Sequence, residues 1–202
     1  VDASNNVIAT GRFVGNNIDF NPGAASSLLS STNSVPDIFV LKLDATGNFV
    51  WAMRLGANNS DQAHSIKADA AGNIYLAGYF SATVDFDNGA GNANLVSFGG
   101  PDGFVAKYSS AGGFVWAKQF GGTGTDAIYG MVMDASSNIY ITGTFQGTMD
   151  VDPDAGTTSL VSAGAEDIYI AKLNSSGALV WGKRVGGAGI DLSTGIAIDG
   201  AG

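Results

Sequence analysis

Apolar and polar residues alternate over short runs along the whole chain, and clusters of Gly, Asn, Asp and Ser separate the runs. In the middle of the chain this pattern predicts four strands, at about 62–69, 73–80, 103–109 and 113–120. Turn residues at 70–73 and 109–113 predict hairpins that join the first strand to the second and the third to the fourth. No segment shows a sustained 3.6-residue apolar period, so we predict no helices.

Both faces of the predicted strands are apolar. Along 103–109, Phe104, Ala106 and Tyr108 occupy one face, and Val105 occupies the other. A strand that is buried on both sides belongs to a sheet packed between two others. The pattern therefore favours stacked sheets over one sheet with a solvated face.

The strand pattern recurs with a fixed period. Trp51, Trp116 and Trp181 follow one another at intervals of 65 residues, in the motifs Phe-Val-Trp-Ala, Phe-Val-Trp-Ala and Leu-Val-Trp-Gly. Four short antiparallel strands per repeat predict β-propeller blades. A parallel β-helix is the weaker alternative, because hairpin turns imply antiparallel strands. We predict an all-β fold of three 65-residue repeats that forms part of a larger or oligomeric propeller.

The repeats divide a single domain, 1–202, into units of about 1–68, 69–133 and 134–198, and 199–202 begins the next unit. The first unit starts at its second strand, and the sequence ends after the first strand of a further unit. Closed propellers typically have four to eight blades. We expect one of two arrangements: the C-terminal strand completes the N-terminal sheet, within one chain or between two copies, or the repeats belong to a longer tandem array.

Several segments resemble the SBBP-type bacterial β-propeller repeat. The matching segments are Gly-Asn-Ile-Tyr-Leu-Ala-Gly (72–78), Thr-Val-Asp-Phe-Asp (83–87), Asp-Gly-Phe-Val-Ala-Lys (102–107) and Gly-Phe-Val-Trp-Ala-Lys (113–118). The resemblance covers essentially the whole chain. It implies an exported or cell-surface bacterial protein, as in Bacteroidetes, and it says little about function.

Composition narrows the classes of partner. The 202 residues are 45% hydrophobic and 13% charged, with a net charge of −9 and no cysteine. The acidic balance argues against nucleic acid and against anionic membrane surfaces, and it leaves cations as natural small partners. The absence of cysteine excludes disulfides and thiolate metal sites. No apolar run approaches the roughly 20 residues of a membrane span.

The segment that follows the second strand of each repeat carries alternating acidic residues. It reads Asp19-Phe-Asn-Pro-Gly, Asp85-Phe-Asp87-Asn-Gly and Asp150-Val-Asp152-Pro-Asp154-Ala-Gly. Alternating oxygen ligands on a Gly-bent loop suit Ca²⁺, and the third copy has the most. The alternative is that these side chains cap a turn by accepting backbone N–H groups. A full EF-hand would need a later Glu, which is missing.

Other polar positions have structural interpretations. Asp61, Asp126 and Asp191 follow Gly-rich segments that we interpret as strand-entry turns, since a phosphate loop needs a helix and a Lys. Lys42 and Asp37, with their counterparts, could line a shared channel or pair across blades, but we favour a solvated strand edge. We interpret the tryptophans as packing between blades.

His64 is the only histidine, which excludes a His-rich metal site. Composition leaves room for a Ser-His-Asp triad, but the nucleophile motif G-x-S-x-G is missing. We therefore expect a non-catalytic module of an exported surface protein that serves as an adhesion, spacer or assembly unit. Its expected partners are further copies or repeats of itself, or a surface glycan or protein. Two alternatives stay open: a Ca²⁺-assisted carbohydrate-binding propeller, and a fragment of a secreted propeller hydrolase or lyase.

Overall fold

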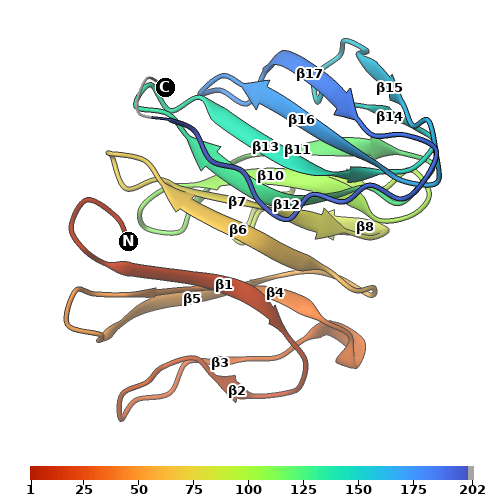
Figure 1. Ribbon diagram of the computed structural model, residues 1–202. Helices are drawn as coiled ribbons and strands as arrows, with labels where there is room; N and C mark the ends of the chain where they lie inside the picture. The colour runs from red at the N-terminus through yellow and green to blue at the C-terminus, as the bar shows by residue number, and fades with distance from the viewer. Residues whose placement is uncertain (200–202) are drawn as a thin grey trace.

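The computed structural model of the chain describes residues 1–199 as antiparallel β-sheets that stack in a row. The strands of the first sheet are β1 (Val7–Phe13), β4 (Asp37–Leu43) and β5 (Phe49–Leu55). The second sheet contains β6 (Gln62–Ala68), β7 (Ile74–Phe80), β10 (Asp102–Tyr108) and β11 (Phe114–Gly122). The third contains β12 (Ala127–Met133), β13 (Ile139–Phe145), β16 (Asp167–Leu173) and β17 (Leu179–Val185). Figure 1 shows them one above another.

Each sheet also carries a short outer hairpin, which follows β1 in the first sheet, β7 in the second and β13 in the third. These hairpins are β2–β3 (Ile18–Asp19, Leu28–Leu29), β8–β9 (Thr83–Asp85, Asn94–Val96) and β14–β15 (Thr148–Asp150, Ser159–Val161). Strand β14 pairs with β11, so the hairpin of the third sheet extends the second sheet to six strands. The sequence pattern did not predict these hairpins, because their strands are only two or three residues long. One 3-10 helix, η1 (Thr32–Ser34), is also present, and the described residues contain no α-helix.

The long strands confirm the prediction for the middle of the chain. The observed β6, β7, β10 and β11 each lie within two residues of the predicted bounds. In β7 and β10 all but one residue is buried, as expected for strands with two apolar faces. The sheets begin at Gln62 and Ala127, whereas the predicted units begin at residues 69 and 134, so each predicted unit straddles two sheets.

Corresponding residues hold the same place in each sheet. The last two long strands of each sheet pair a Lys with a Trp, at Lys42↔Trp51, Lys107↔Trp116 and Lys172↔Trp181, and a bulge follows each pair. The Trp51 ring lies against the turn glycine Gly112 of the second sheet, and the Trp116 ring lies against Gly177 of the third. The structure therefore confirms packing between sheets for Trp51 and Trp116.

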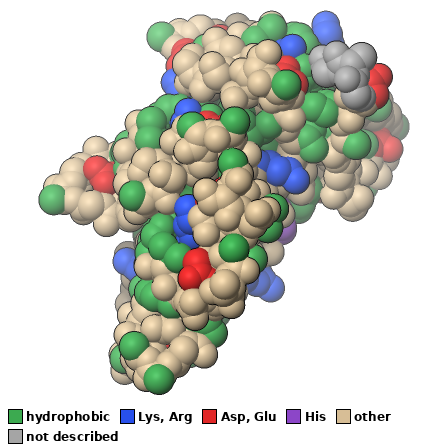
Figure 2. All heavy atoms as spheres, turned by 90° about the vertical axis from the view of Figure 1, so that its left-hand side faces the viewer, with side chains coloured by type: hydrophobic (Ala, Val, Ile, Leu, Met, Phe, Trp, Pro, Cys, Tyr) green, Lys and Arg blue, Asp and Glu red, His purple; other side chains and the backbone are tan. Residues whose placement is uncertain are grey.

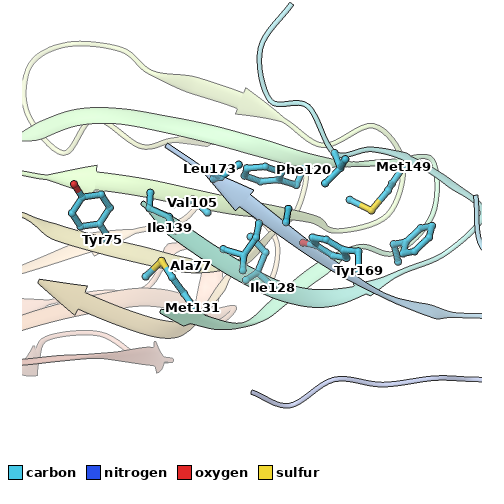
Figure 3. Packing of buried hydrophobic residues seen from close by; sticks show 14 residues of the cluster. Tyr75, Ala77, Val105, Phe120, Ile128, Met131, Ile139, Met149, Tyr169 and Leu173 are labelled. Carbon is cyan, nitrogen blue, oxygen red and sulfur yellow. The ribbon is translucent and has the colours of Figure 1, made fainter. Parts of the chain in front are cut away.

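Two hydrophobic clusters hold the three sheets together. One joins the first and second sheets around Phe80, Phe86 and Phe104. The other joins the second and third around Phe120 and Tyr169, and Figure 3 shows its side chains pointing into the space between the sheets. The core thus lies between sheets rather than within one, so each sheet depends on a neighbour for burial.

The row of sheets stays open in the described part of the chain. Strand β1 pairs only with β4, and residues 191–199 form no strand. The expected closure of the N-terminal sheet by the C-terminal strand of the same chain is therefore not found among residues 1–199. Within the same residues, no helix has the length and hydrophobicity that a membrane crossing requires.

Candidate functional site

The acidic loops follow the outer hairpin strands, and their leading aspartates close the hairpins. Asp150 Oδ1 accepts hydrogen bonds from the backbone N–H groups of Asp152 and Thr158, at 3.0 and 2.9 Å. Asp85 accepts corresponding bonds from Asp87 and Ala93, and Asp19 accepts them from Asn21 and Ser27. The turn-capping interpretation is thus confirmed for all three loops.

The second acidic position of each loop continues the same turn chemistry. Asp152 accepts a hydrogen bond from the Asp154 N–H, and Asp87 accepts one from the Gly89 N–H. Asp154 pairs with Lys118 of the second sheet. No group of three His, Cys, Asp or Glu side chains suited to a metal ion occurs in residues 1–199. Calcium at these loops stays a prediction, which a calorimetric titration with Ca²⁺ would test.

The second and third acidic loops each face the last long strand of the preceding sheet across a hollow. The first hollow has Asp85 and Asp87 on one side and Arg54 on the other. The second has Asp150 and Asp154 on one side and Gln119 on the other. The residue between the two acidic positions points inward: Phe86 and Val151 are fully buried. The loops therefore anchor neighbouring sheets to each other.

A second set of aspartates is buried at the start of β4, β10 and β16, the next-to-last long strand of each sheet. Asp37, Asp102 and Asp167 are fully buried, which corrects the prediction of a solvated strand edge. Arg54 pairs with Asp37 at 2.7 Å, and Arg184 pairs with Asp167. The second sheet has Gln119 in place of the arginine, and burial raises the pKa of Asp102 to about 6. Lys42 is also buried, where it pairs with Asp2 at 2.9 Å.

The aspartates after the Gly-rich segments hold the crossings between sheets. Asp126 accepts hydrogen bonds from the N–H groups of Gly122 and Gln146, and Asp61 accepts them from Ala57 and Ser81. Each aspartate therefore links the turn by which the chain enters a new sheet with the end of the second strand of that sheet. This confirms the strand-entry turn predicted from the sequence. Burial raises the pKa of Asp61 to about 6 and that of Asp126 to about 7.

A different hollow lies between the second and third sheets, where strands β6 and β12 contact each other. Its lining includes Ser60, Tyr79, Thr125 and Tyr129, and most of the exposed lining atoms are apolar. The His64 ring lies next to both tyrosines, at centroid distances of 5.7 Å to Tyr79 and 4.9 Å to Tyr129. We call this group of residues the aromatic hollow.

The sequence alone did not reveal the aromatic hollow. His64 and Tyr129 share one repeat position, and Tyr79 has Thr144 as its counterpart. The common fold does not require one side-chain type at such positions. Their variation between repeats is the signal in the sequence that could have pointed to the hollow. Burial lowers the pKa of His64, so its imidazole is neutral near pH 7.

Charge is spread thinly over the visible surface despite the net charge of −9. Figure 2 shows the left-hand side of the molecule in Figure 1, where single red and blue side chains lie among uncharged ones. Much of the acidic charge is used in turns and in pairs with Lys and Arg. This surface offers no large patch of one sign to a charged polymer.

The stacked antiparallel sheets and their common register resemble the blades of β-propeller proteins. Residues 115–144 match the family model of the SBBP β-propeller repeat, which confirms the resemblance noted from the sequence. That match spans the fourth strand of the second sheet and the first two strands of the third.

Two curated proteins are similar to the chain. An uncharacterized WD repeat-containing protein of Acanthamoeba polyphaga mimivirus is 27% identical over 175 residues, which cover 81% of this chain and 13% of that protein. The regulatory protein FlaEY of Caulobacter vibrioides is 26% identical over 135 residues, which cover 65% of this chain and 14% of that protein. The chain thus spans about a seventh of either relative. These likenesses indicate a repeat module of a kind that presents extended binding surfaces.

Proposed function

We propose that this chain is a non-catalytic protein-interaction module, built from three 65-residue β-propeller repeats, in an exported protein of the bacterial cell surface. Rigid sheets hold turns and inter-sheet hollows in fixed positions, and a partner protein binds one of them. The SBBP match and the similarity to a WD repeat-containing protein support the class of module. The resemblance to exported bacterial proteins supports the location.

The observation that carries the proposal is the aromatic hollow. Tyr79, Tyr129 and His64 bring three rings together beside Ser60 and Thr125, at an open junction of two sheets. Tyrosine is enriched at the centres of protein interfaces, because its ring gives apolar contact and its hydroxyl gives a hydrogen bond.

Several aspartate carboxylates already accept hydrogen bonds from the backbone, which supports a non-catalytic role. Asp61 and Asp126 hold crossings between sheets, and Asp85 and Asp150 close hairpins. Each carboxylate accepts two backbone hydrogen bonds and serves the same purpose in more than one repeat. The hydrogen bonds of these four carboxylates to the backbone therefore support a structural role for them.

A binding experiment tests the aromatic hollow. The immobilised chain is incubated with secreted and cell-surface proteins of the native bacterium, beside a Tyr79→Ser/Tyr129→Ser variant. A Val161→Ser variant is the control, because Val161 is 60% exposed on the outer hairpin. We expect the wild type and the control to retain a protein that the double variant loses. Retention of the same proteins by all three would contradict the proposal.

The location is tested separately. Protease added to intact cells should degrade the protein that carries this chain while a cytoplasmic marker stays intact. Survival of the protein until the cells are lysed would place it inside the cell and overturn this part of the proposal.

A further inference from the structure

A second hollow adjoins the aromatic hollow, just after the end of strand β7. It includes the ring of Phe98, which is 65% exposed, and it shares Ser81 and Pro101 with the aromatic hollow. Its other lining residues are polar or small, namely Asn59, Ala82, Ser97, Gly99 and Gly100. We call the two hollows together the two-part groove. One half of this groove holds tyrosine rings, and the other half holds the ring of Phe98.

No charged side chain lines either half of the two-part groove. Asp61 and Asp126, which neighbour lining residues in the sequence, are fully buried. The chain as a whole has a net charge of −9, so an uncharged groove is a distinct feature of its surface. A charged ligand would lose water there without gaining an ionic partner. The groove therefore suits an uncharged ligand.

Two β-bulges place rings beside the groove. The register of β6 with β7 shifts between Ala63 and Ser65, and that of β12 with β13 shifts between Ile128 and Gly130. His64 and Tyr129 are therefore the extra residues of their bulges. A bulge bends its strand and turns a side chain away from the regular alternation, as is common beside binding sites.

The backbone of the groove offers little to an added β-strand. The N–H groups of Ser81, Ala82 and Gly100 already donate to Asp61, to Ser97 and to the Gly124 carbonyl, at 2.9, 2.9 and 3.1 Å. Strand β12 pairs only with β13 in the described chain, but the bulge interrupts its other edge. Bulges of this kind discourage strand pairing at an edge. A ligand would have to bind through the side chains of the groove.

Side-chain donors are free in both halves of the groove. Within residues 1–199, the hydroxyls of Thr125 and Tyr129 and the amide of Asn59 have no hydrogen-bond partner. These groups can donate to carbonyl oxygens of a ligand. The groove thus combines flat apolar rings with separate donors, and it carries no charge.

We propose that the two-part groove binds an uncharged, proline-rich segment of a partner protein in the polyproline II conformation. Such a segment has no internal hydrogen bonds, and it exposes backbone carbonyls while proline supplies no N–H. Its pyrrolidine rings pack on Tyr79, Tyr129 and Phe98, and its carbonyls accept hydrogen bonds from the free donors. Proline-rich segments are recognised in this way by aromatic-lined grooves, because their conformation is already formed before binding.

The inference rests on the proposed function, because it names the chemistry of the partner that the aromatic hollow binds. A neutral oligosaccharide is the rival ligand. The exposed lining of the aromatic hollow is mostly apolar, which favours proline rings over a sugar covered with hydroxyl groups. The experiment includes both ligands.

Fluorescence anisotropy with labelled synthetic peptides tests the inference. The probe is an uncharged peptide of about ten residues in which Pro-Pro pairs alternate with Leu and Ala. In the matched peptide, Gly and Ser replace every proline. We expect the wild-type chain to bind the proline peptide at least about tenfold more tightly than the matched peptide.

Three variants test the groove itself. Phe98→Ser removes an aromatic anchor and should weaken binding of the proline peptide by at least about tenfold. Tyr129→Phe keeps the ring and removes the donor, so it should weaken binding by about threefold to tenfold. Val96→Ser is the control, because Val96 is 54% exposed on β9 and lines neither hollow. Circular dichroism melts confirm that each variant is folded.

The outcomes separate this inference from the proposed function. A folded wild type that binds no proline peptide up to about 1 mM overturns the inference, and so does equal binding of the two peptides. An equal effect of Val96→Ser and Phe98→Ser, or binding of cellohexaose in place of the proline peptide, also overturns it. If a partner protein is retained through Tyr79 and Tyr129 while the proline peptide fails to bind, the proposed function stands and only this inference falls.

Discussion

The second sheet differs from its neighbours in the residue that lies beside its buried aspartate. Arg54 and Arg184 each pair with a fully buried aspartate, whereas Gln119 takes that place beside Asp102. Hydrogen bonds from the Ala163 N–H and from Arg184 lower the pKa of Asp167, and burial raises the pKa of Asp102 to about 6. The same fold therefore buries one carboxylate with a cation and another without.

We predict that Gln119→Arg stabilises the protein above pH 7. The new guanidinium would lie where Arg54 and Arg184 lie, and a hydrogen bond to a charged group contributes about 1.5–3 kcal/mol. For a chain of this size, each 1 kcal/mol raises the melting temperature by about 2–4 °C. Thermal melts at about pH 8 and pH 4 check this, because Asp102 is protonated at the lower pH and the gain should then shrink.

Arg54→Gln is the matched reverse exchange in the first sheet, and it should lower the melting temperature at about pH 8. An equal effect of Gln119→Arg at both pH values would show that packing, rather than the charge of Asp102, is responsible.

At the scale of elements, the crossings between sheets depend on one carboxylate each. Asp126 accepts the N–H groups of Gly122 and Gln146, which lie at the end of one sheet and after the second strand of the next. Asp126→Ala should leave both donors without this partner and cost about 1–3 kcal/mol. Asp126→Asn keeps an acceptor oxygen and removes the buried charge, so its cost at about pH 8 should be smaller. Urea unfolding of both variants measures the difference, and equal costs would contradict the role of the hydrogen bonds.

Strand β7 has a partner on both edges, whereas β1 pairs on one edge only within residues 1–199, so the same substitution should have different costs in the two strands. A Cβ on Gly78 would fall 2.0 Å from a backbone oxygen of β6, so Gly78→Ala should separate these strands. We expect a loss of at least about 3 kcal/mol, in the range of severe core substitutions. Gly11 is the corresponding residue of β1, and a Cβ there would meet the Phe39 ring at 3.1 Å. Gly11→Ala should therefore cost less than about 1 kcal/mol, since only this ring must shift. Similar unfolding free energies for the two variants would refute this difference.

The long strands were predictable because each carries several apolar residues on both faces and ends at Gly, Asn or Asp turns. The outer hairpins were not, because Ile18–Asp19 and Thr83–Asp85 are too short for a period to show. The burial of Asp37 was also missed, since a carboxylate at a strand start looks solvated until the chain folds Arg54 onto it. The aromatic hollow joins residues from different repeats, so only the packing of the sheets brings them together.

At the scale of the whole molecule, stability should depend on two opposed groups of aspartates. Burial raises the pKa values of Asp61 and Asp102 to about 6 and that of Asp126 to about 7. Their unfolded pKa is about 3.9. The folded protein therefore holds more protons between about pH 4 and pH 7, and the free energy of unfolding falls as the pH rises through this window.

Turn aspartates act in the opposite direction at lower pH. Hydrogen bonds from Thr46 and Asn48 lower the pKa of Asp44, and bonds from Asn138 lower that of Asp134. Their stabilisation is present above the unfolded pKa and is lost as the pH falls through the folded one. His64, with its lowered pKa, adds a small rise in stability toward neutral pH, against the fall from three aspartates.

We therefore predict a maximum of stability between about pH 4 and pH 5, with a decline toward pH 8 and a steeper one below pH 3. Thermal melts across this range measure the profile. The Asp61→Asn/Asp102→Asn/Asp126→Asn variant should remove most of the decline toward pH 8, because its three side chains no longer change charge. Ser136→Ala, an exposed change beside the Asp134 turn, should leave the decline in place. A wild-type melting temperature that rises steadily from pH 5 to pH 8 would mean that these carboxylates are not the groups that govern stability.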